Sequence, residues 1–259
     1  MSIQSSNPPS VEWTTEPSAH IGRTLVAPGL PDEYGLFYTM TDFSGRLSGD
    51  DAAALRAHIE QRWGKDIGLS TCTQVHGTAV EFAGDPSTGW REIGECDGIW
   101  SDRPGIALGI KVADCLPVTL IDPEHRVIAN LHSGWRGAAQ GIVPRAIEEM
   151  RRLSSFDSSS AFAWLGPAIR QCCFEVGDEV VAAFRQRYGP VDDCVRAGAR
   201  GRPHFDLAAM TRRLLAAEGI PADRIADAAL CTRCEVDLFH SYRRDGAGSG
   251  RILAVAIQA

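Results

Sequence analysis

Two histidines and one cysteine have the side-chain types that could hold a catalytic metal ion. His76 lies in the segment Thr-Gln-Val-His-Gly, Cys115 in Ala-Asp-Cys-Leu-Pro, and His132 in His-Ser-Gly-Trp-Arg-Gly. A zinc ion held by three protein groups keeps a fourth position for water or substrate, which is typical of a catalytic site rather than a structural one. Such an ion lowers the pKa of its bound water toward neutrality. The three residues therefore predict a zinc site able to supply hydroxide.

The spacing of these residues leaves a simpler interpretation open. They are far apart along the chain, so local structure does not fix their geometry. On spacing alone, Cys115 is expected to be a buried thiol, and His76 and His132 ordinary hydrogen-bonded side chains. Each of the three, however, stands where a strand pattern meets a turn with glycine or proline, and such positions are rigid yet accessible.

Four further cysteines could form a second metal site. Cys231 and Cys234 form a Cys-x-x-Cys pair, and Cys172 and Cys173 are adjacent. Together they could make a closed structural zinc site, although adjacent cysteines seldom bind one zinc ion together. The competing interpretation is that they are packing thiols near a turn. The other cysteines are expected to be small buried or half-buried side chains, namely Cys72, Cys96 and Cys194.

The residues that follow His132 predict an anion site. Residues 133–137 lead into a helix, and free backbone amides at a helix start, with Arg136 beside them, suit a phosphate. Alternatively, this segment is a tight turn in which Trp135 packs and Arg136 pairs with a carboxylate. Asp114, next to Cys115, could act as a general acid or base, or simply hydrogen-bond a turn.

The elements that must position these residues form a β-rich pattern with interspersed helices. The strand patterns are at 34–40, 69–77, 106–113, 118–121, 127–131, 161–165 and 252–257, and the helical patterns at 50–63, 137–153, 178–188 and 206–219. The strands at 118–121 and 127–131 form a predicted hairpin whose second arm leads to His132. We therefore expect a mixed α/β layered fold with a β-rich centre.

Size and charge narrow the class of protein. The 259 residues are 44% hydrophobic and contain no linker-like stretch, so we expect a single catalytic domain at 21–259. Residues 1–20 are rich in serine, proline and glutamate and are expected to form a flexible tail. The net charge of −7 argues against a nucleic-acid binder. The absence of a long apolar run argues against a membrane span. Residues 1–20 lack the features of a secretory signal, so the eight cysteines are expected to be mostly reduced.

Five motifs together resemble those of a known family. They are Gln74-Val75-His76-Gly77, Ala113-Asp114-Cys115-Leu116-Pro117-Val118, His132-Ser133-Gly134-Trp135-Arg136-Gly137, Leu165-Gly166-Pro167-Ala168-Ile169 with Phe174-Glu175-Val176-Gly177, and Ser241-Tyr242-Arg243-Arg244-Asp245. From about Leu69 to the C-terminus, the chain resembles the purine nucleoside phosphorylase family long labelled polyphenol oxidase or laccase domain. That family includes the peptidoglycan editing factor.

The resemblance implies a zinc site made of His76, Cys115 and His132. It implies phosphorolysis of adenosine, inosine, guanosine and S-methyl-5'-thioadenosine, with deamination of adenosine. It also implies a mixed β-sandwich flanked by helices, and a cytoplasmic monomer without nucleic-acid or membrane partners. The residues assigned here are Asp114 and Cys115 for catalysis, and Gln74, Arg136 and Arg243 for substrate binding, the two arginines as anion contacts.

One segment departs from the family pattern. Near the N-terminus, members of the family have a segment that resembles Thr-Arg-x-Gly-Gly-Val-Ser. In this chain the corresponding residues, 38–46, read Tyr-Thr-Met-Thr-Asp-Phe-Ser-Gly-Arg. Met40 replaces the arginine, and a later asparagine-bearing segment is missing. This departure puts substrate choice, or phosphorolysis itself, in question, although Arg46 could take the place of the missing arginine.

Three other functions remain open. Copper could occupy the His-Cys-His site, because copper outcompetes zinc for such ligands; a multicopper oxidase, however, needs about ten histidines, and the chain has seven. A cysteine hydrolase that edits cell-wall precursors would use Cys115 as nucleophile and His76 or His132 as base. A non-catalytic binding protein is the third.

Overall fold

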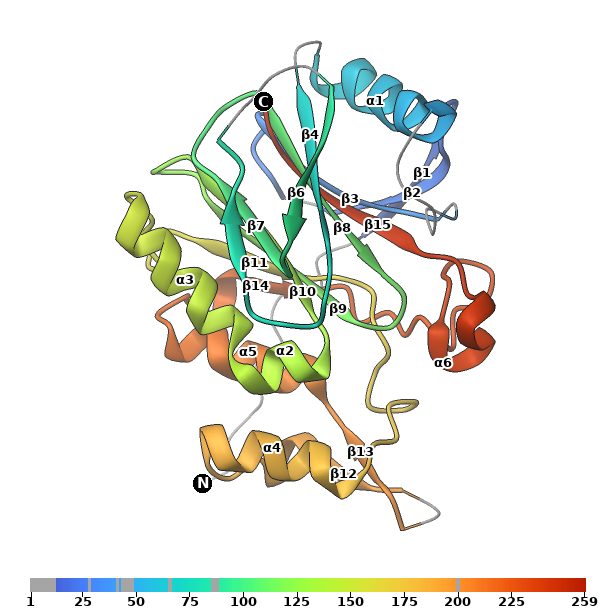
Figure 1. The fold of residues 1–259 in the computed structure, drawn as a ribbon, viewed down its shortest axis with the longest axis vertical. Coiled ribbons are helices and arrows are strands. Elements are labelled where there is room, and N and C mark those ends of the chain that lie inside the picture. Colours follow the sequence, from blue (N-terminus) through green and yellow to red (C-terminus); the bar gives the residue numbers. More distant parts are fainter. Residues whose placement is uncertain are drawn as a thin grey trace.

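The computed structural model of the chain describes residues 13–27, 29–40, 42, 49–64, 67–84, 89–198 and 201–259. Its strands are β1 (Thr14–Ser18), β2 (Gly22–Val26), β3 (Tyr34–Thr39), β4 (Gly68–Thr73), β5 (Val80–Phe82), β6 (Trp90–Glu95), β7 (Gly98–Ser101), β8 (Ile106–Val112), β9 (Leu116–Asp122), β10 (Val127–Ser133), β11 (Phe162–Leu165), β12 (Val195–Ala197), β13 (Pro203–Phe205), β14 (Ile225–Asp227) and β15 (Ile252–Gln258). Its helices are α1 (Gly49–Trp63), α2 (Trp135–Gln140), α3 (Ile142–Leu153), α4 (Asp178–Tyr188), α5 (Leu207–Ala217) and α6 (Tyr242–Asp245) (Figure 1).

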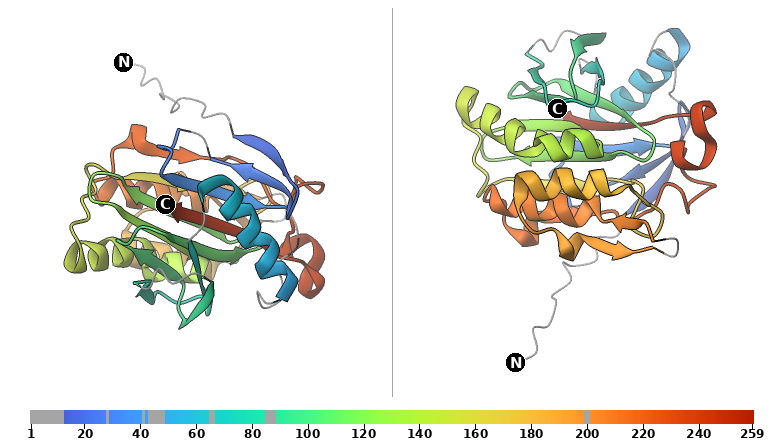
Figure 2. Two further views of the ribbon diagram at one scale, coloured as in Figure 1. Left: turned by 90° about the horizontal axis from the view of Figure 1, so that it is seen from above. Right: turned by 60° about the horizontal axis from the view of Figure 1, so that its bottom comes forward.

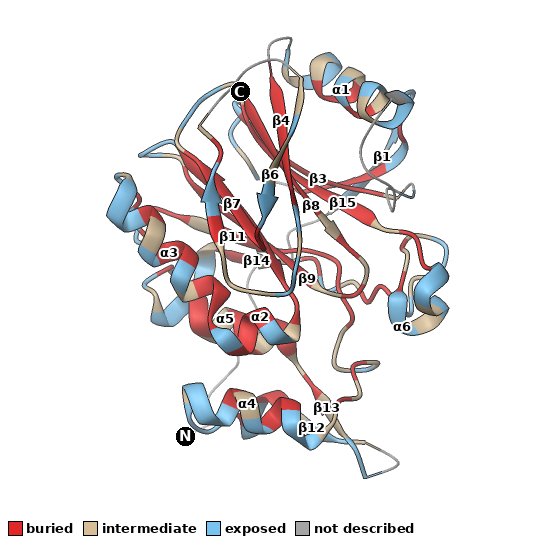
Figure 3. Cartoon of the chain, in the orientation of Figure 1, coloured by how far each residue is buried: buried red, intermediate tan, exposed pale blue. Residues whose placement is uncertain are grey.

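Two mixed sheets form the centre of the molecule. One has seven strands in the order β1-β2-β3-β15-β8-β4-β6, and the other has six in the order β14-β11-β9-β10-β7-β5. Their facing sides share one apolar cluster, and the buried Asn130 of β10 donates hydrogen bonds to the carbonyl oxygens of Leu108 and Ala254 in the other sheet, each at 2.9 Å. Because β8, β9, β10 and β15 are covered on both faces, they are buried along almost their whole length rather than at alternate residues (Figure 3).

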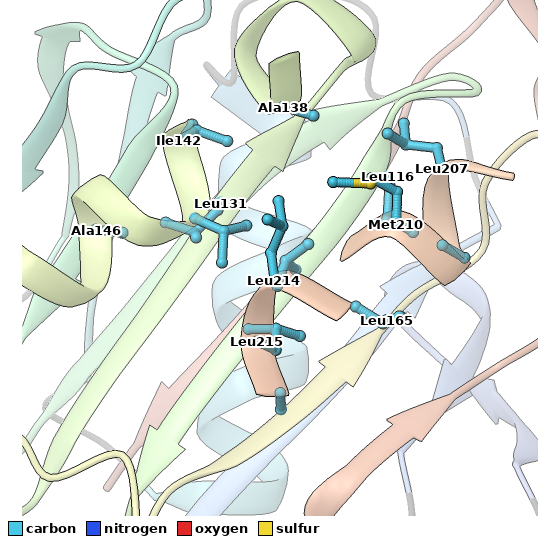
Figure 4. Packing of buried hydrophobic residues seen from close by; sticks show 14 of the residues in the cluster. Leu116, Leu131, Ala138, Ile142, Ala146, Leu165, Leu207, Met210, Leu214 and Leu215 are labelled. Atoms are coloured by element: carbon cyan, nitrogen blue, oxygen red, sulfur yellow. The ribbon is translucent and has the colours of Figure 1, made fainter. Parts of the chain in front are cut away.

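Helices cover the outer faces of both sheets. Leu55 and Ile59 of α1 pack against Phe37 on the outer face of the seven-stranded sheet. Helices α2, α3 and α5 cover the outer face of the six-stranded sheet, on the side opposite α1, and α4 packs on α2 (Figure 2). Figure 4 shows part of this second layer, in which Ala138, Ile142, Ala146, Met210 and Leu214 gather around Leu116, Leu131 and Leu165. The predicted β-sandwich flanked by helices is thus confirmed.

The predicted tail at 1–20 extends too far. Residues 14–18 form β1, which pairs antiparallel with β2 at the edge of the sheet. Glu16 forms an ion pair with Arg62, and the Ser18 hydroxyl lies 3.0 Å from Nδ1 of His58. The polar composition suggested a tail, but it also suits a largely exposed edge strand paired on one side only. Of the other residues of the predicted tail, 1–12 lie outside the described range, and 13, 19 and 20 flank β1.

The predicted helix at 137–153 is two helices. Gly141 has a left-handed backbone (φ 93°) that ends α2, and α3 begins at the next residue. Glycine reaches this conformation without the steric cost that a side chain would add. The break at Gly141 falls four residues after Gly137, the last residue of the His-Ser-Gly-Trp-Arg-Gly motif. Among the described residues, no helix combines the length and apolar character needed to cross a membrane.

Candidate active site

The structure brings His76, Cys115 and His132 together. One ligand atom from each lies within 4.8 Å of the other two, although the residues come from three separate segments. Strands β9 and β10 pair so that Ser133 lies opposite Leu116. This pairing places Cys115, just before β9, beside His132, near the end of β10. His76 follows β4 in a turn instead of ending the longer predicted strand, and its ring meets that of His132 edge to face at 4.8 Å between centroids.

Asp97 is a site residue that sequence reasoning missed. It is fully buried, and its Oδ1 lies 2.7 Å from Nδ1 of His132. Because Nδ1 of His132 donates to this carboxylate, Nε2 is the nitrogen left to bind an ion. Such a partner fixes the orientation of a metal-binding histidine and increases its basicity. The segment around Asp97 carries little signal, since the preceding strand β6 is mostly polar and half-exposed.

Asp97 also holds the turn that carries His76. Its carboxylate accepts hydrogen bonds from the backbone N–H groups of His76 (2.9 Å) and Gly77 (2.6 Å). His76 has a positive φ of 62°, which is uncommon for a residue other than glycine and carries a steric cost. One carboxylate therefore orients two of the three candidate ligands.

Cys115 and His132 influence each other's ionisation. Burial opposes ionisation of the thiol, but the charge of His132 and hydrogen bonds from both histidines lower the pKa of Cys115 to about 6. Burial likewise opposes the charged form of His132, but the Cys115 thiolate and Asp97 raise the pKa of His132 to about 9. Between these values the metal-free site holds a thiolate beside an imidazolium. The thiolate is the form of cysteine that binds metals.

The pH dependence of Cys115 alkylation tests this pairing in metal-free protein. The pKa of Cys115 is lowered, so its thiolate is lost as the pH falls through about 6. The rate of iodoacetamide modification should therefore have its midpoint near pH 6, measured by peptide mapping. The exposed Cys234 is the internal control, because its hydrogen bond with Cys173 raises the pKa of Cys234 to about 11. A Cys115 midpoint close to 9, the ordinary thiol value, would contradict the pairing.

The three candidate ligands line one cavity of about 670 Å³. This volume is within the range of small-molecule sites. The cavity also contains every residue that the sequence assigned to catalysis or substrate binding. Its lining includes Gln74, Asp114, Arg136, Phe174, Tyr242 and Arg243.

Asp114 is held firmly beside Cys115. Its Oδ1 accepts a hydrogen bond from the Thr232 hydroxyl, and its Oδ2 accepts one from the backbone N–H of Arg243, both at 2.6 Å. Its backbone is left-handed (φ 81°). Asp114 thus joins the cysteine loop to two C-terminal segments, the hydrogen-bonding role that the sequence left open. Its acid–base role stays a prediction.

The assigned binding residues differ in how free their side chains are. Gln74 exchanges two hydrogen bonds with the backbone of Lys111 and so fixes the end of β8. Arg243 donates to the carbonyl of Glu175 at 2.8 Å. Arg136 is exposed, lies over the Trp135 ring at 4.5 Å, and has no carboxylate partner among the described residues. The predicted alternative, in which Arg136 pairs with a carboxylate, therefore finds no support in the described part of the chain.

The segment that departs from the family pattern contacts a residue that lines the cavity. Of residues 38–46, the structure describes Tyr38 to Met40 and Asp42, so Arg46 lies outside the described range. Asp42 accepts a hydrogen bond from the backbone N–H of Arg251 at 2.8 Å, and Arg251 lines the cavity. The effect of this segment on substrate choice stays a prediction.

Gly134 leaves no room for a side chain beside the candidate ligands. An added Cβ would lie 3.0 Å from Sγ of Cys115 and 3.3 Å from Cδ2 of His76. Gly134→Ala should therefore displace the ligands and lower both metal affinity and turnover about tenfold. Metal titration and steady-state kinetics would measure both effects. Gly248→Ala is the matched control, because its Cβ would meet nothing within 4 Å. Equal behaviour of the two variants would contradict the expectation.

A second group of side chains could also hold a metal ion. The four cysteines Cys172, Cys173, Cys231 and Cys234 each place a sulfur within 4.8 Å of the others. The sequence left open whether these residues meet, and the structure brings them together. Cys172 and Cys234 are exposed, whereas Cys231 is buried.

Comparisons with known proteins agree with this architecture. The family model described as multi-copper polyphenol oxidoreductase laccase matches residues 39–259. The chain is 34% identical over 207 residues to purine nucleoside phosphorylase SCO2081 of Streptomyces coelicolor, covering 78% of this chain and 81% of that protein. It is 42% identical over 157 residues to adenosine deaminase RL5 of an unknown prokaryotic organism, covering 60% of this chain and 59% of that protein. The match thus spans less than two thirds of the deaminase.

Solved structures share the fold over almost the whole chain. YlmD from Geobacillus stearothermophilus superposes with a TM-score of 0.78 at 25% identity, covering 95% of this chain and 99% of that one. The hypothetical protein YfiH of Bacillus licheniformis gives a TM-score of 0.82 at 24% identity, with the same coverage, and supports the fold alone. The chain therefore belongs to the laccase-domain family, whose relatives include proteins named purine nucleoside phosphorylases and an adenosine deaminase.

Proposed function

We propose that this protein is a zinc-dependent purine nucleoside phosphorylase that also deaminates adenosine. The observation that carries the proposal is the meeting of His76, Cys115 and His132 in the cavity that Arg136 and Arg243 also line. Metal ligands and cationic side chains in one cavity suit a reaction between a neutral nucleoside and an anionic phosphate. The relatives named purine nucleoside phosphorylases support this choice of substrate.

Two kinds of side chain in the cavity would bind the two proposed substrates, phosphate and the purine nucleoside. The guanidinium groups of Arg136 and Arg243 provide the positive charge that phosphate requires. Phe174 and Tyr242 offer aromatic surface on which a purine ring can stack. Adenosine, inosine, guanosine and S-methyl-5'-thioadenosine share the purine and the ribose, so one such pocket can accept all four.

The donor set fits zinc. Cys115 favours the thiolate, and Asp97 orients His132 so that Nε2 is free to bind, as a three-ligand zinc site requires. When bound, zinc supplies an acidic water for deamination and positive charge beside the reacting groups. Asp114 holds the Cys115 segment to Thr232 and Arg243 through its two hydrogen bonds, and it is the candidate acid or base next to Cys115 in the sequence.

Copper chemistry finds less support in the arrangement of ligands. Within the described residues, two groups of side chains could hold a metal, and only the group of His76, Cys115 and His132 contains histidine. A multicopper oxidase needs several histidine-rich centres. We therefore propose that any copper bound at this site replaces zinc without conferring a multicopper mechanism.

Inosine with phosphate tests the proposed reaction without interference from deamination. Zinc-loaded protein should produce hypoxanthine and ribose 1-phosphate, detected by liquid chromatography with mass spectrometry. Omitting phosphate should abolish both products. Release of free ribose at the same rate without phosphate would show a hydrolase instead, and unchanged inosine would contradict the proposal.

Arg136→Ala should weaken phosphate binding selectively. Loss of a charge-assisted contact of this type costs on the order of 1.5 kcal/mol, so the KM for phosphate should rise roughly tenfold while the KM for inosine changes little. Arg152→Ala is the matched control, because Arg152 is an exposed arginine of α3 that pairs with Glu149 away from the cavity. Equal phosphate KM values for the two variants would remove Arg136 from the phosphate site.

A cysteine hydrolase is the second candidate, and one observation favours it. Cys115, His132 and Asp97 lie in the order of a nucleophile, a base and an orienting carboxylate: the Cys115 sulfur is within 4.8 Å of the His132 ring, which is hydrogen-bonded to Asp97. Such an enzyme would act without metal, since a zinc-bound thiolate is a poor nucleophile. Cleavage of peptidoglycan precursors by metal-stripped protein, with inhibition by added zinc, would favour this candidate over the phosphorylase.

A further inference from the structure

The four-cysteine group has the dimensions of a closed metal site. The sulfur of Cys234 lies 3.4 Å from that of Cys173 and 3.9 Å from that of Cys172. In a tetrahedral zinc site with Zn–S bonds of about 2.3 Å, neighbouring sulfurs are roughly 3.8 Å apart. The thiols therefore already have nearly the spacing that one zinc ion would impose.

The six-stranded sheet brings the two cysteine pairs together. Strands β11 and β14 are parallel neighbours, so the segments after them leave the sheet at the same edge. This pairing continues beyond the strands in a parallel bridge between Ala168 and Cys231. Cys172 and Cys173 follow a few residues after Ala168, and Cys234 follows Cys231, so both pairs lie in adjoining loops.

Local turns help to bring the four sulfurs close to one another. The backbone N–H of Cys173 donates to the carbonyl of Arg170 at 2.8 Å, and that of Cys234 donates to the carbonyl of Cys231 at 3.1 Å. The first turn lets two adjacent cysteines reach the same point, which an extended backbone would not allow. Burial opposes ionisation of Cys231, but the nearby backbone N–H groups of Arg170, Cys234 and Arg233 lower the pKa of its thiol. Such donors stabilise the negative charge that thiolate ligands accumulate.

We propose that Cys172, Cys173, Cys231 and Cys234 bind a second zinc ion, as a closed structural site separate from the His76, Cys115 and His132 group. Four protein ligands leave no position for water, so this ion would have no part in the chemistry. This proposal goes beyond the proposed function, because neither phosphorylase nor hydrolase chemistry needs a second metal ion.

The second ion would hold together the loops at 170–174 and 231–235, which lie beside the substrate cavity. Thr232 lies between two of the proposed ligands, and its hydroxyl donates to Asp114, the neighbour of Cys115. Phe174, which lines the cavity, directly follows Cys173. The site therefore links these two loops to the segment that carries Cys115. The two loops contain little regular secondary structure that would otherwise fix their positions.

Metal analysis of separate variants tests the proposal. Wild-type protein purified without added metal should contain about two zinc ions per chain, and Cys115→Ala and Cys234→Ala about one each. Cys194→Ala, which removes a buried thiol outside both groups, should keep both ions. Cobalt-substituted Cys115→Ala should still show the strong thiolate-to-cobalt charge-transfer absorption of a site with several sulfurs. Absence of metal from folded Cys115→Ala would overturn the proposal.

Thiol accessibility provides a second test that needs no variant at this site. Cys172 and Cys234 are exposed side chains. In the purified wild type they should resist iodoacetamide until a chelator removes the ion, as peptide mapping would show. Rapid modification of both before chelation would overturn the proposal. So would an intact mass two hydrogens lower, with a disulfide mapped between these cysteines.

Discussion

Cys115→Ala is expected to lose the active-site zinc ion and with it almost all turnover of purine nucleosides. Two imidazoles remain, but the thiolate supplies the negative charge and the third ligand of the site. Because the proposed chemistry depends on this ion, we expect kcat/KM for inosine and adenosine to fall by roughly 10³-fold or more. Steady-state kinetics and elemental analysis of the same samples would measure both effects.

Cys194→Ala is the matched control for this substitution. Cys194 is buried in the helix-covered core and belongs to neither group of candidate ligands. The control should keep its metal and its turnover, with only a modest loss of stability. If Cys115→Ala kept both its activity and its full zinc content, Cys115 would not be a ligand.

Asp97→Asn should weaken zinc binding by about 10- to 100-fold, the usual effect of removing the partner of a metal-binding histidine. The carboxylate accepts from His132, His76 and Gly77 at once, whereas the amide nitrogen of asparagine accepts nothing. One buried donor would be left unpaired, at a cost of about 1–3 kcal/mol in stability. Competition with a chromophoric chelator would measure the affinity, and urea unfolding the stability.

Asp122→Asn separates the effect on zinc from the effect on folding. Asp122 is an equally buried carboxylate that accepts hydrogen bonds from Ser160 and Asp157, far from the cavity. It should lose stability to a similar extent but keep its zinc affinity. Equal zinc affinities for the Asp97 and Asp122 variants would show that Asp97 only supports the fold.

The sequence predicts the centre of the fold because the relevant signals there are local. The hairpin of β9 and β10 was predicted from two apolar runs around a polar turn. That hairpin alone brings Cys115 close to His132. The apolar run of β15 was likewise predicted, since a strand covered on both faces needs no alternation.

Other parts of the site depend on contacts that no local pattern encodes. Asp97 reaches His132 only after β7 has paired with β10, and β6 before it is too polar to be recognised as a strand. The left-handed turn at His76 exists because Asp97 holds it. The meeting of Cys172 and Cys234 depends on the parallel pairing of β11 with β14, which is a tertiary contact.

The most direct test of the account is the zinc dependence of adenosine conversion. Metal-stripped wild-type protein would be incubated with adenosine and phosphate before and after zinc is restored, with all products identified by mass spectrometry. We predict no conversion before zinc is restored, and adenine, ribose 1-phosphate and inosine afterwards. Unchanged adenosine in protein whose zinc is shown to be bound through Cys115 would contradict the account.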